Sequence, residues 1–282
     1  MRYTKATKTH LNLLETHNSL RRNGGLEVLR PIDSFTPRLR RNLKMIPKKI
    51  HYCWFGRGEM PQVAKECIAS WHKYMPDWEY KLWNEDNFDV NCTPYSKEAY
   101  EAGKYAFVSD VARLVALEQE GGIYLDVRFE VYKSFEPLLS NKAFAGFEGC
   151  KRKLLMMGVL GSEAHGEWIN EVLRMYDGRH FKMTDGTLDL TTNVLFTTVN
   201  MEKQGFVRNW EEQYYKDLHV YPTEYFSPRH TTGEYFRTEN TYCEHRGTSS
   251  WANHGGGKGK LAMWVGQKNM TRLIKLKRKL LG

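Results

Sequence analysis

The stretch that decides the fold is FVSDVARLVALEQEGGIYLD, residues 107–126. Its first part predicts a helix over residues 107–120, because apolar residues recur there on one helical face. The Gly121–Gly122 pair ends that helix, since glycine adopts the backbone conformation of a helix C-terminus. Ile123, Tyr124 and Leu125 then predict a short strand that ends at the carboxylate of Asp126. The apolar face consists of Phe107, Val111, Leu114, Val115 and Leu117.

The segments before this stretch predict a strand–helix–strand unit. Residues 49–55 are rich in β-forming side chains and stop at Gly56, which is typical of a strand that ends in a loop. A helix is predicted over residues 61–74, with Pro61 in its first turn, and residues 78–83 alternate as a second strand. Strands joined through a helix are normally parallel. The order therefore predicts an α/β fold with a mainly parallel central sheet flanked by helices.

Further elements are predicted around this unit. They are a helix over 96–102, strands over 143–147 and 154–160, helices over 163–176 and 193–204, and a basic amphipathic helix over 269–281.

Basic residues are concentrated at the two ends of the chain. Residues 1–44 contain ten Lys/Arg and three Asp/Glu, residues 268–282 contain six basic and no acidic residues, and residues 45–267 carry a net charge of −4. The middle of the chain therefore offers no general basic face, and we expect no nucleic-acid partner. We predict a basic N-terminal extension over 1–44. It is either disordered or not native, and the second alternative is considered because the segment that begins at Met45 reads like the start of a protein. A globular domain over 45–260 and a basic C-terminal helix over 261–282 follow.

Cysteine usage and hydropathy exclude several classes of protein. The five cysteines form no CxxC pair, so a zinc site or a disulfide framework is not expected. The sequence contains no run of about 18 apolar residues and no signal-peptide pattern at its start. We expect a cytoplasmic protein, either free or held peripherally at the inner face of the membrane through its basic tail.

Asp126 occupies a position suited to a metal–diphosphate site. Ligands of open α/β sheets bind beyond the carboxyl ends of the strands. A divalent ion such as Mn²⁺ or Mg²⁺ prefers carboxylate and phosphate oxygens, and it neutralises charge on a leaving diphosphate.

Several motifs together resemble the DXD-containing sugar transferases of glycosyltransferase family 32. That family includes capsular polysaccharide, lipopolysaccharide and mannosyl transferases, and the glucosyltransferase domains of large clostridial toxins are more distantly similar. The matching motifs are residues 46–56 (IPKKIHYCWFG), 83–86 (WNED), 109–113 (SDVAR), 121–126 (GGIYLD), and His245 with Ser250–Trp251. The resemblance implies a GT-A-like fold over 45–260, a nucleotide-sugar donor (UDP- or GDP-sugar) and a glycan or lipid-linked glycan acceptor.

The resemblance also implies roles for individual residues. Trp54 would stack on the nucleotide base, and Asp110 and Arg113, three positions apart on one helix face, would hold the sugar and ribose. The donor-binding set would be Trp54, Asp110, Arg113, Tyr124, Asp126, Asn193, Ser250 and Trp251. The metal ligands would be Asp126, His245 and Ser250, and the catalytic residues Asp126, Arg128 and Asp110.

Each of these residues also has a plain structural interpretation. Trp54 could be a core aromatic, Asp110 and Arg113 an ordinary surface ion pair worth about 0.3–0.5 kcal/mol, and Asp126 a turn residue. His245 could be a structural histidine, and Asn193 could simply begin a helix. Their joint occurrence favours the functional interpretation.

Arg128 departs from the family pattern, because it stands where the second aspartate of the DXD motif is expected. Three interpretations stay open. Arg128 neutralises the diphosphate directly; Glu130 supplies the missing carboxylate; or the site is impaired.

We therefore expect a glycosyltransferase that moves a sugar from a nucleotide sugar to a glycan hydroxyl, in surface polysaccharide biosynthesis. The resemblance implies retention of the anomeric configuration. The alternative is a catalytically impaired GT-A-fold protein that binds nucleotide sugar without turnover.

Overall fold

The computed structural model describes residues 45–149, 152–228 and 237–247. They lie in the compact unit Lys44–Gly282. The predicted extension over 1–44 and the predicted helix over 261–282 lie outside the described residues. None of the described helices is long and apolar enough to cross a membrane.

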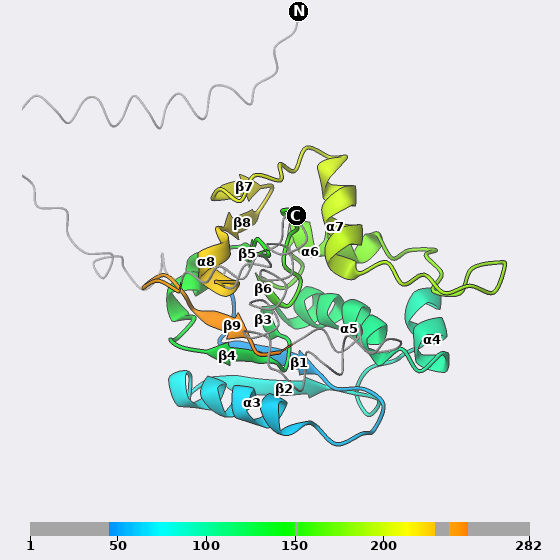
Figure 1. The fold of residues 1–282 in the computed structure, drawn as a ribbon, viewed down its shortest axis with the longest axis horizontal. Helices are drawn as coiled ribbons and strands as arrows, with labels where there is room; N and C mark the ends of the chain where they lie inside the picture. The colour runs from blue at the N-terminus through cyan, green and yellow to red at the C-terminus, as the bar shows by residue number, and fades with distance from the viewer. Residues whose placement is uncertain (1–44, 150–151, 229–236, 248–282) are drawn as a thin grey trace, which may run out of the picture. The chain divides into compact units, whose positions relative to one another are not determined.

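A seven-stranded sheet forms the centre, with the strand order β2-β1-β3-β6-β5-β8-β7 (Figure 1). Strands β6 and β7 run opposite to the other five, so the sheet is mixed but mainly parallel. The strands are β1 Lys49–Cys53, β2 Glu79–Trp83, β3 Gly122–Leu125, β5 Ala143–Gly146, β6 Val159–Ser162, β7 Gln213–Tyr215 and β8 Leu218–Tyr221. A separate antiparallel pair joins β4 Phe129–Val131 to β9 Cys243–His245.

Apolar clusters cover both faces of the sheet, and β3 shows how its sequence divides between them. Ile123 and Leu125 pack in one cluster with Trp71, whereas Tyr124 packs in the other with Leu114, because successive strand side chains point to opposite faces. Helix α3 (Gln62–Tyr74) contributes to the first cluster and helix α5 (Tyr105–Glu120) to the second. The other helices are α4 Pro94–Glu101, η3 Glu136–Ser140, α6 Glu167–Arg174, α7 Asn193–Glu202 and α8 Thr223–Phe226.

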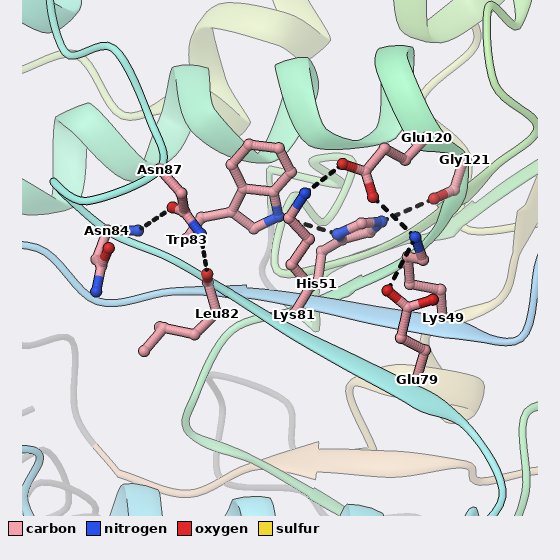
Figure 2. A network of polar contacts seen from close by, with 10 residues as sticks. All are labelled: Lys49, His51, Glu79, Lys81, Leu82, Trp83, Asn84, Asn87, Glu120 and Gly121. Carbon is pink, nitrogen blue, oxygen red and sulfur yellow. Dashed lines mark hydrogen bonds and ion pairs between the residues drawn. The ribbon is translucent and has the colours of Figure 1, made fainter.

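A polar network fixes the junction between α5 and β3 (Figure 2). The buried His51 donates from Nε2 to the carbonyl oxygen of Gly121 (2.8 Å) and accepts at Nδ1 from the Trp83 indole N–H (2.9 Å). Burial lowers the pKa of His51, so the imidazole is neutral in this arrangement. Lys49 bonds Glu120 at the end of α5 (2.8 Å). The network holds α5 against β1 and β2 and so fixes where the next strand begins.

The predicted α/β class, with a mainly parallel central sheet flanked by helices, is confirmed. The predicted strand over 154–160 is displaced, because the regular strand β6 begins only at Val159 and Leu155 forms an isolated bridge with Phe147.

Candidate active site

A cavity of about 800 Å³ opens at the carboxyl ends of β1, β3 and β5. This edge is where open α/β sheets bind their ligands. The predicted site residues that line the cavity are Trp54, Asp110, Arg113, Tyr124, Asp126, Arg128, Asn193 and His245. Ser250 and Trp251 lie outside the described residues. The structure thus brings every described member of the predicted site into one cavity.

Arg113 is the buried centre of the site. Its Nη2 bonds Asp110 Oδ1 (2.9 Å), and its Nη1 donates to the Met157 carbonyl oxygen (2.6 Å). Nη1 also lies 3.4 Å from Asp126 Oδ1, and the guanidinium lies 4.6 Å from the centre of the Tyr124 ring. Asp110 and Arg113 are only 7% and 4% exposed. They therefore do not form an ordinary ion pair on the helix surface, which was the structural alternative considered from the sequence.

Asp110 shares the Arg113 guanidinium with Asp126. Burial raises the pKa of Asp110 to about 7, with the Arg113 charge opposing that shift and the Asp126 charge adding to it. Near neutral pH, the Asp110 carboxyl is consequently able both to accept and to donate hydrogen bonds. This suits it to bind the hydroxyls of a sugar.

Asp126 projects from the end of β3 and remains partly open, with a 36% exposed side chain. Its Oδ1 accepts a hydrogen bond from the Tyr124 hydroxyl (2.7 Å), and its backbone N–H donates to the Gly158 carbonyl oxygen (2.9 Å). None of the described residues donates a hydrogen bond to Oδ2, which lies over Gly158, where an added Cβ would be 2.7 Å away. One carboxylate oxygen is thus fixed while the other is available for a ligand.

A turn after β3 places Arg128 at the cavity. The Phe129 N–H donates to the Asp126 carbonyl oxygen (3.0 Å), and the Arg128 carbonyl oxygen accepts from the Arg246 N–H (2.7 Å). Glu130 bonds the Arg246 guanidinium (2.6 Å) and is absent from the residues that line the cavity. The structure therefore gives no support to the interpretation in which Glu130 replaces the missing aspartate.

The described residues do not complete a metal site. No group of three or more His, Cys, Asp or Glu side chains able to hold an ion occurs among them. His245, at the end of β9, donates from Nδ1 to the Gly247 carbonyl oxygen (3.1 Å), and burial lowers its pKa. Its Nε2 is then an acceptor. Asp126 and His245 are the two predicted ligands among the described residues, and the third, Ser250, lies outside them.

The loop after β1 presents Trp54 to the cavity. Its indole N–H donates to the Gly58 carbonyl oxygen (2.6 Å), and the Gly56 N–H donates to Glu85 Oε1 (2.6 Å). Gly56 has φ +93°, and an added Cβ would lie 2.3 Å from the Tyr105 ring. This position therefore requires glycine. Glu85, within the 83–86 motif, fixes the loop that carries the indole.

Helix α7 begins at the cavity, with Thr192, Asn193 and Val194 in its lining. The N-terminus of a helix carries a partial positive charge and backbone N–H groups that favour phosphate. Asn193 Oδ1 accepts from the Val194 N–H (2.7 Å), which leaves the amide NH₂ of the side chain for a ligand.

Glu148 is a cavity residue that the sequence interpretation missed. It lies two residues beyond the end of β5. Burial raises the pKa of its carboxyl to about 7, and the nearby charge of Asp126 adds to this shift. The signal was present, since an acid after a predicted strand is the same pattern that singled out Asp126.

Residues 61–145 match the family described as the glycosyltransferase sugar-binding region containing DXD motif. Two curated relatives are fungal. Inositol phosphoceramide mannosyltransferase 3 of Schizosaccharomyces pombe is 33% identical over 107 residues, covering 35% of this chain and 29% of the relative. Mannosyl phosphorylinositol ceramide synthase SUR1 of Saccharomyces cerevisiae is 27% identical over 197 residues, covering 63% and 49%. The chain spans half or less of the length of these relatives.

Among solved structures, the glycosyltransferase PaToxG has a TM-score of 0.42 at 18% identity, covering 57% of this chain and 70% of that one. The galactosyltransferase LgtC, solved with donor and acceptor sugar analogs, has a TM-score of 0.33 at 16% identity, covering 79% and 95%.

The segment that matches the family contains Asp110, Arg113 and Asp126, which meet at the carboxyl edge of the sheet. Through this segment, the chain is similar to the glycosyltransferase sugar-binding region that contains the DXD motif.

Proposed function

We propose that this chain, on a GT-A-like fold, transfers a sugar from a nucleotide-sugar donor to a hydroxyl of a glycan acceptor. The observation that carries this proposal is the meeting of Trp54, Asp110, Arg113 and Asp126 in one cavity. Its volume of about 800 Å³ is within the range of small-molecule sites.

The donor would lie along the β1–α5–β3 side of the cavity. Trp54 would stack on the base, because its indole is held at the end of β1 by the bond to Gly58. Asp110 and Asp126 would bind hydroxyls of the donor. Arg113 would act mainly by fixing these two carboxylates, since its guanidinium already bonds Asp110 and Met157. Catalysis would then come from positioning and electrostatic stabilisation.

Negative charge develops on the diphosphate as the sugar leaves. Arg128 and the N-terminus of α7 are the cationic features at the described cavity that would stabilise it. Mn²⁺ or Mg²⁺ would supply further neutralisation when bound, and Asp126 and His245 would be ligands to such an ion.

The finer features of the reaction follow from the resemblance. They are retention of configuration, a UDP- or GDP-linked donor, a glycan or lipid-linked glycan acceptor in surface polysaccharide biosynthesis, and a cytoplasmic location with peripheral membrane contact. A screen of donors should test nucleotide-linked mannose first, because two relatives are named for mannosyl transfer.

The test is a thermal-shift screen of UDP- and GDP-sugars followed by donor hydrolysis with and without Mn²⁺. A specific ligand raises the apparent melting temperature, because it binds the folded state. Stabilisation together with hydrolysis supports the transferase.

A second candidate rests on Arg128, which occupies the place of the second DXD aspartate. In that case the chain would be an impaired transferase that binds nucleotide sugar without turnover. Binding without hydrolysis supports this candidate, and hydrolysis restored by Arg128→Asp strengthens it.

A further inference from the structure

Glu148 is held rigidly at the cavity by the backbone around it. The strand β5 runs parallel to β1 and β3, so its carboxyl end lies at the same edge of the sheet. The Glu148 N–H donates to the Leu154 carbonyl oxygen (2.8 Å), and the Gly149 N–H donates to Ser227 Oγ (3.1 Å). The side chain therefore projects from a fixed backbone into the cavity that holds Asp126.

The Glu148 carboxyl has no partner among the described residues. It lines the cavity and is half-buried, and no hydrogen bond or ion pair from residues 45–149, 152–228 or 237–247 reaches its oxygens. Asp110, Asp126 and Glu85 each have a donor or a cation beside them. Burying an acid without a partner is costly, so such a group in a cavity indicates a ligand that completes its hydrogen bonds.

Glu148 lies on the side of the cavity away from the base-binding loop. Trp54, Asp110 and Arg113 come from β1 and α5, whereas Glu148 follows β5, and β5 is separated from β3 by β6. Gly149, Met156 and Ser227 line the cavity with it and provide small or apolar surface. This side has the composition of a sugar subsite, with one carboxyl able to bind a hydroxyl beside small and apolar side chains.

We propose that Glu148 binds the acceptor sugar, with its carboxyl hydrogen-bonded to a hydroxyl of that sugar so that the attacking hydroxyl faces the donor. The proposal rests on the proposed glycosyltransferase function. It assigns to Glu148 a role in acceptor binding that is separate from donor binding and from stabilisation of the diphosphate.

The experiment compares Glu148→Gln with the wild type in three assays on the full chain. The assays measure donor binding by calorimetry, donor hydrolysis by water, and transfer to the methyl α- and β-glycosides of mannose, glucose and galactose. Glu101→Gln is the matched control, because Glu101 is exposed on α4 and lies outside the cavity lining. Circular dichroism and the melting temperature verify that both variants fold.

We expect Glu148→Gln to bind donor within about 2-fold of the wild type and to hydrolyse it within about 3-fold. Transfer at a fixed concentration of methyl glycoside falls about 10- to 100-fold, because glutamine removes the charge that strengthens a hydrogen bond to a carboxylate. The loss appears as a raised KM for the methyl glycoside.

Three results overturn the assignment. The first is that Glu148→Gln loses donor binding and transfer equally. The second is that Glu148→Gln transfers the sugar at the wild-type rate. The third is that no methyl glycoside changes the rate at which the wild type turns over the donor. A wild type that binds no nucleotide sugar contradicts the proposed function itself and is recognised in the first assay.

Discussion

Arg113 Nη1 lies 3.4 Å from Asp126 Oδ1, so a buried guanidinium on α5 fixes the carboxylate at the end of β3. The same guanidinium bonds Asp110 at 2.9 Å. One cation therefore sets the positions of two carboxylates that the helix and the strand bring to the cavity.

Replacing Arg113 tests this arrangement. In Arg113→Ala, the buried Asp110 and the half-buried Asp126 lose their common cation, and the free energy of unfolding falls by about 3–5 kcal/mol. Arg113→Lys keeps the charge but loses the fork that bonds Asp110 and Met157 together, so it recovers only part of that stability. Urea denaturation at pH 8 measures both. A lysine variant as stable as the wild type argues against the forked contact.

Gly158→Ala is predicted to displace Asp126. An added Cβ would lie 2.7 Å from Asp126 Oδ2 and 2.7 Å from the Phe129 ring, so both side chains must move. Donor affinity falls about 10-fold or more, and the variant resembles Asp126→Ala in calorimetric titrations. If Gly158→Ala binds the nucleotide sugar with wild-type affinity, Asp126 Oδ2 does not contact the nucleotide sugar.

Trp54→Ala is predicted to weaken donor binding about 10- to 100-fold, because base–aromatic stacking contributes about 1–3 kcal/mol per base. Trp54→Phe keeps a flat ring and retains most of the affinity. Titration with UDP and with GDP measures the loss for the nucleotide alone. An unchanged affinity in Trp54→Ala places the base elsewhere.

Arg128→Ala is predicted to lower donor hydrolysis about 10-fold or more, since a cation at the diphosphate is lost. Donor binding changes less than hydrolysis, because the charge grows as the bond breaks. Rates are measured in EDTA and in Mn²⁺. Strong stimulation of the wild type by Mn²⁺, with little effect of Arg128→Ala, contradicts neutralisation by the arginine.

Glu148 is predicted to make the stability of the ligand-free protein depend on pH. Its pKa is about 7 in the folded state, above the ordinary value of 4.5, so the folded state is favoured while the carboxyl is protonated. Stability is lost as the pH rises from about 5 through 7. At pH 8, Glu148→Gln is therefore more stable than the wild type by roughly 1–3 kcal/mol, and near pH 4 the two are alike. Urea denaturation across this range checks the sign, and a constant difference contradicts it.

The sequence predicts the part of the site that depends on the succession of strands and helices along the chain. Asp126 ends an apolar strand after a helix that carries Asp110 and Arg113, and Trp54 ends the first strand, so topology alone brings them to one edge of the sheet. Glu148 follows the same rule, because it comes directly after the predicted strand over 143–147. No site residue was predicted at the end of that strand.

Other features depend on contacts between distant segments. Arg246 reaches Glu130 across a sequence separation of 116 residues, and the pairing of β4 with β9 has no local signal. The predicted strand over 154–160 becomes regular only at Val159, and just before it the Met157 carbonyl oxygen accepts from the Arg113 side chain, 44 residues away in the sequence. A β-forming sequence pattern does not show such a contact with a distant side chain.

Equilibrium binding of nucleotide sugars to the wild type and to Asp126→Ala tests the central claim most directly. The predicted result is that a UDP- or GDP-sugar binds the wild type with one site and that Asp126→Ala weakens this binding about 10-fold or more. Absence of binding by every nucleotide sugar, or binding that Asp126→Ala leaves unchanged, contradicts a donor site in this cavity.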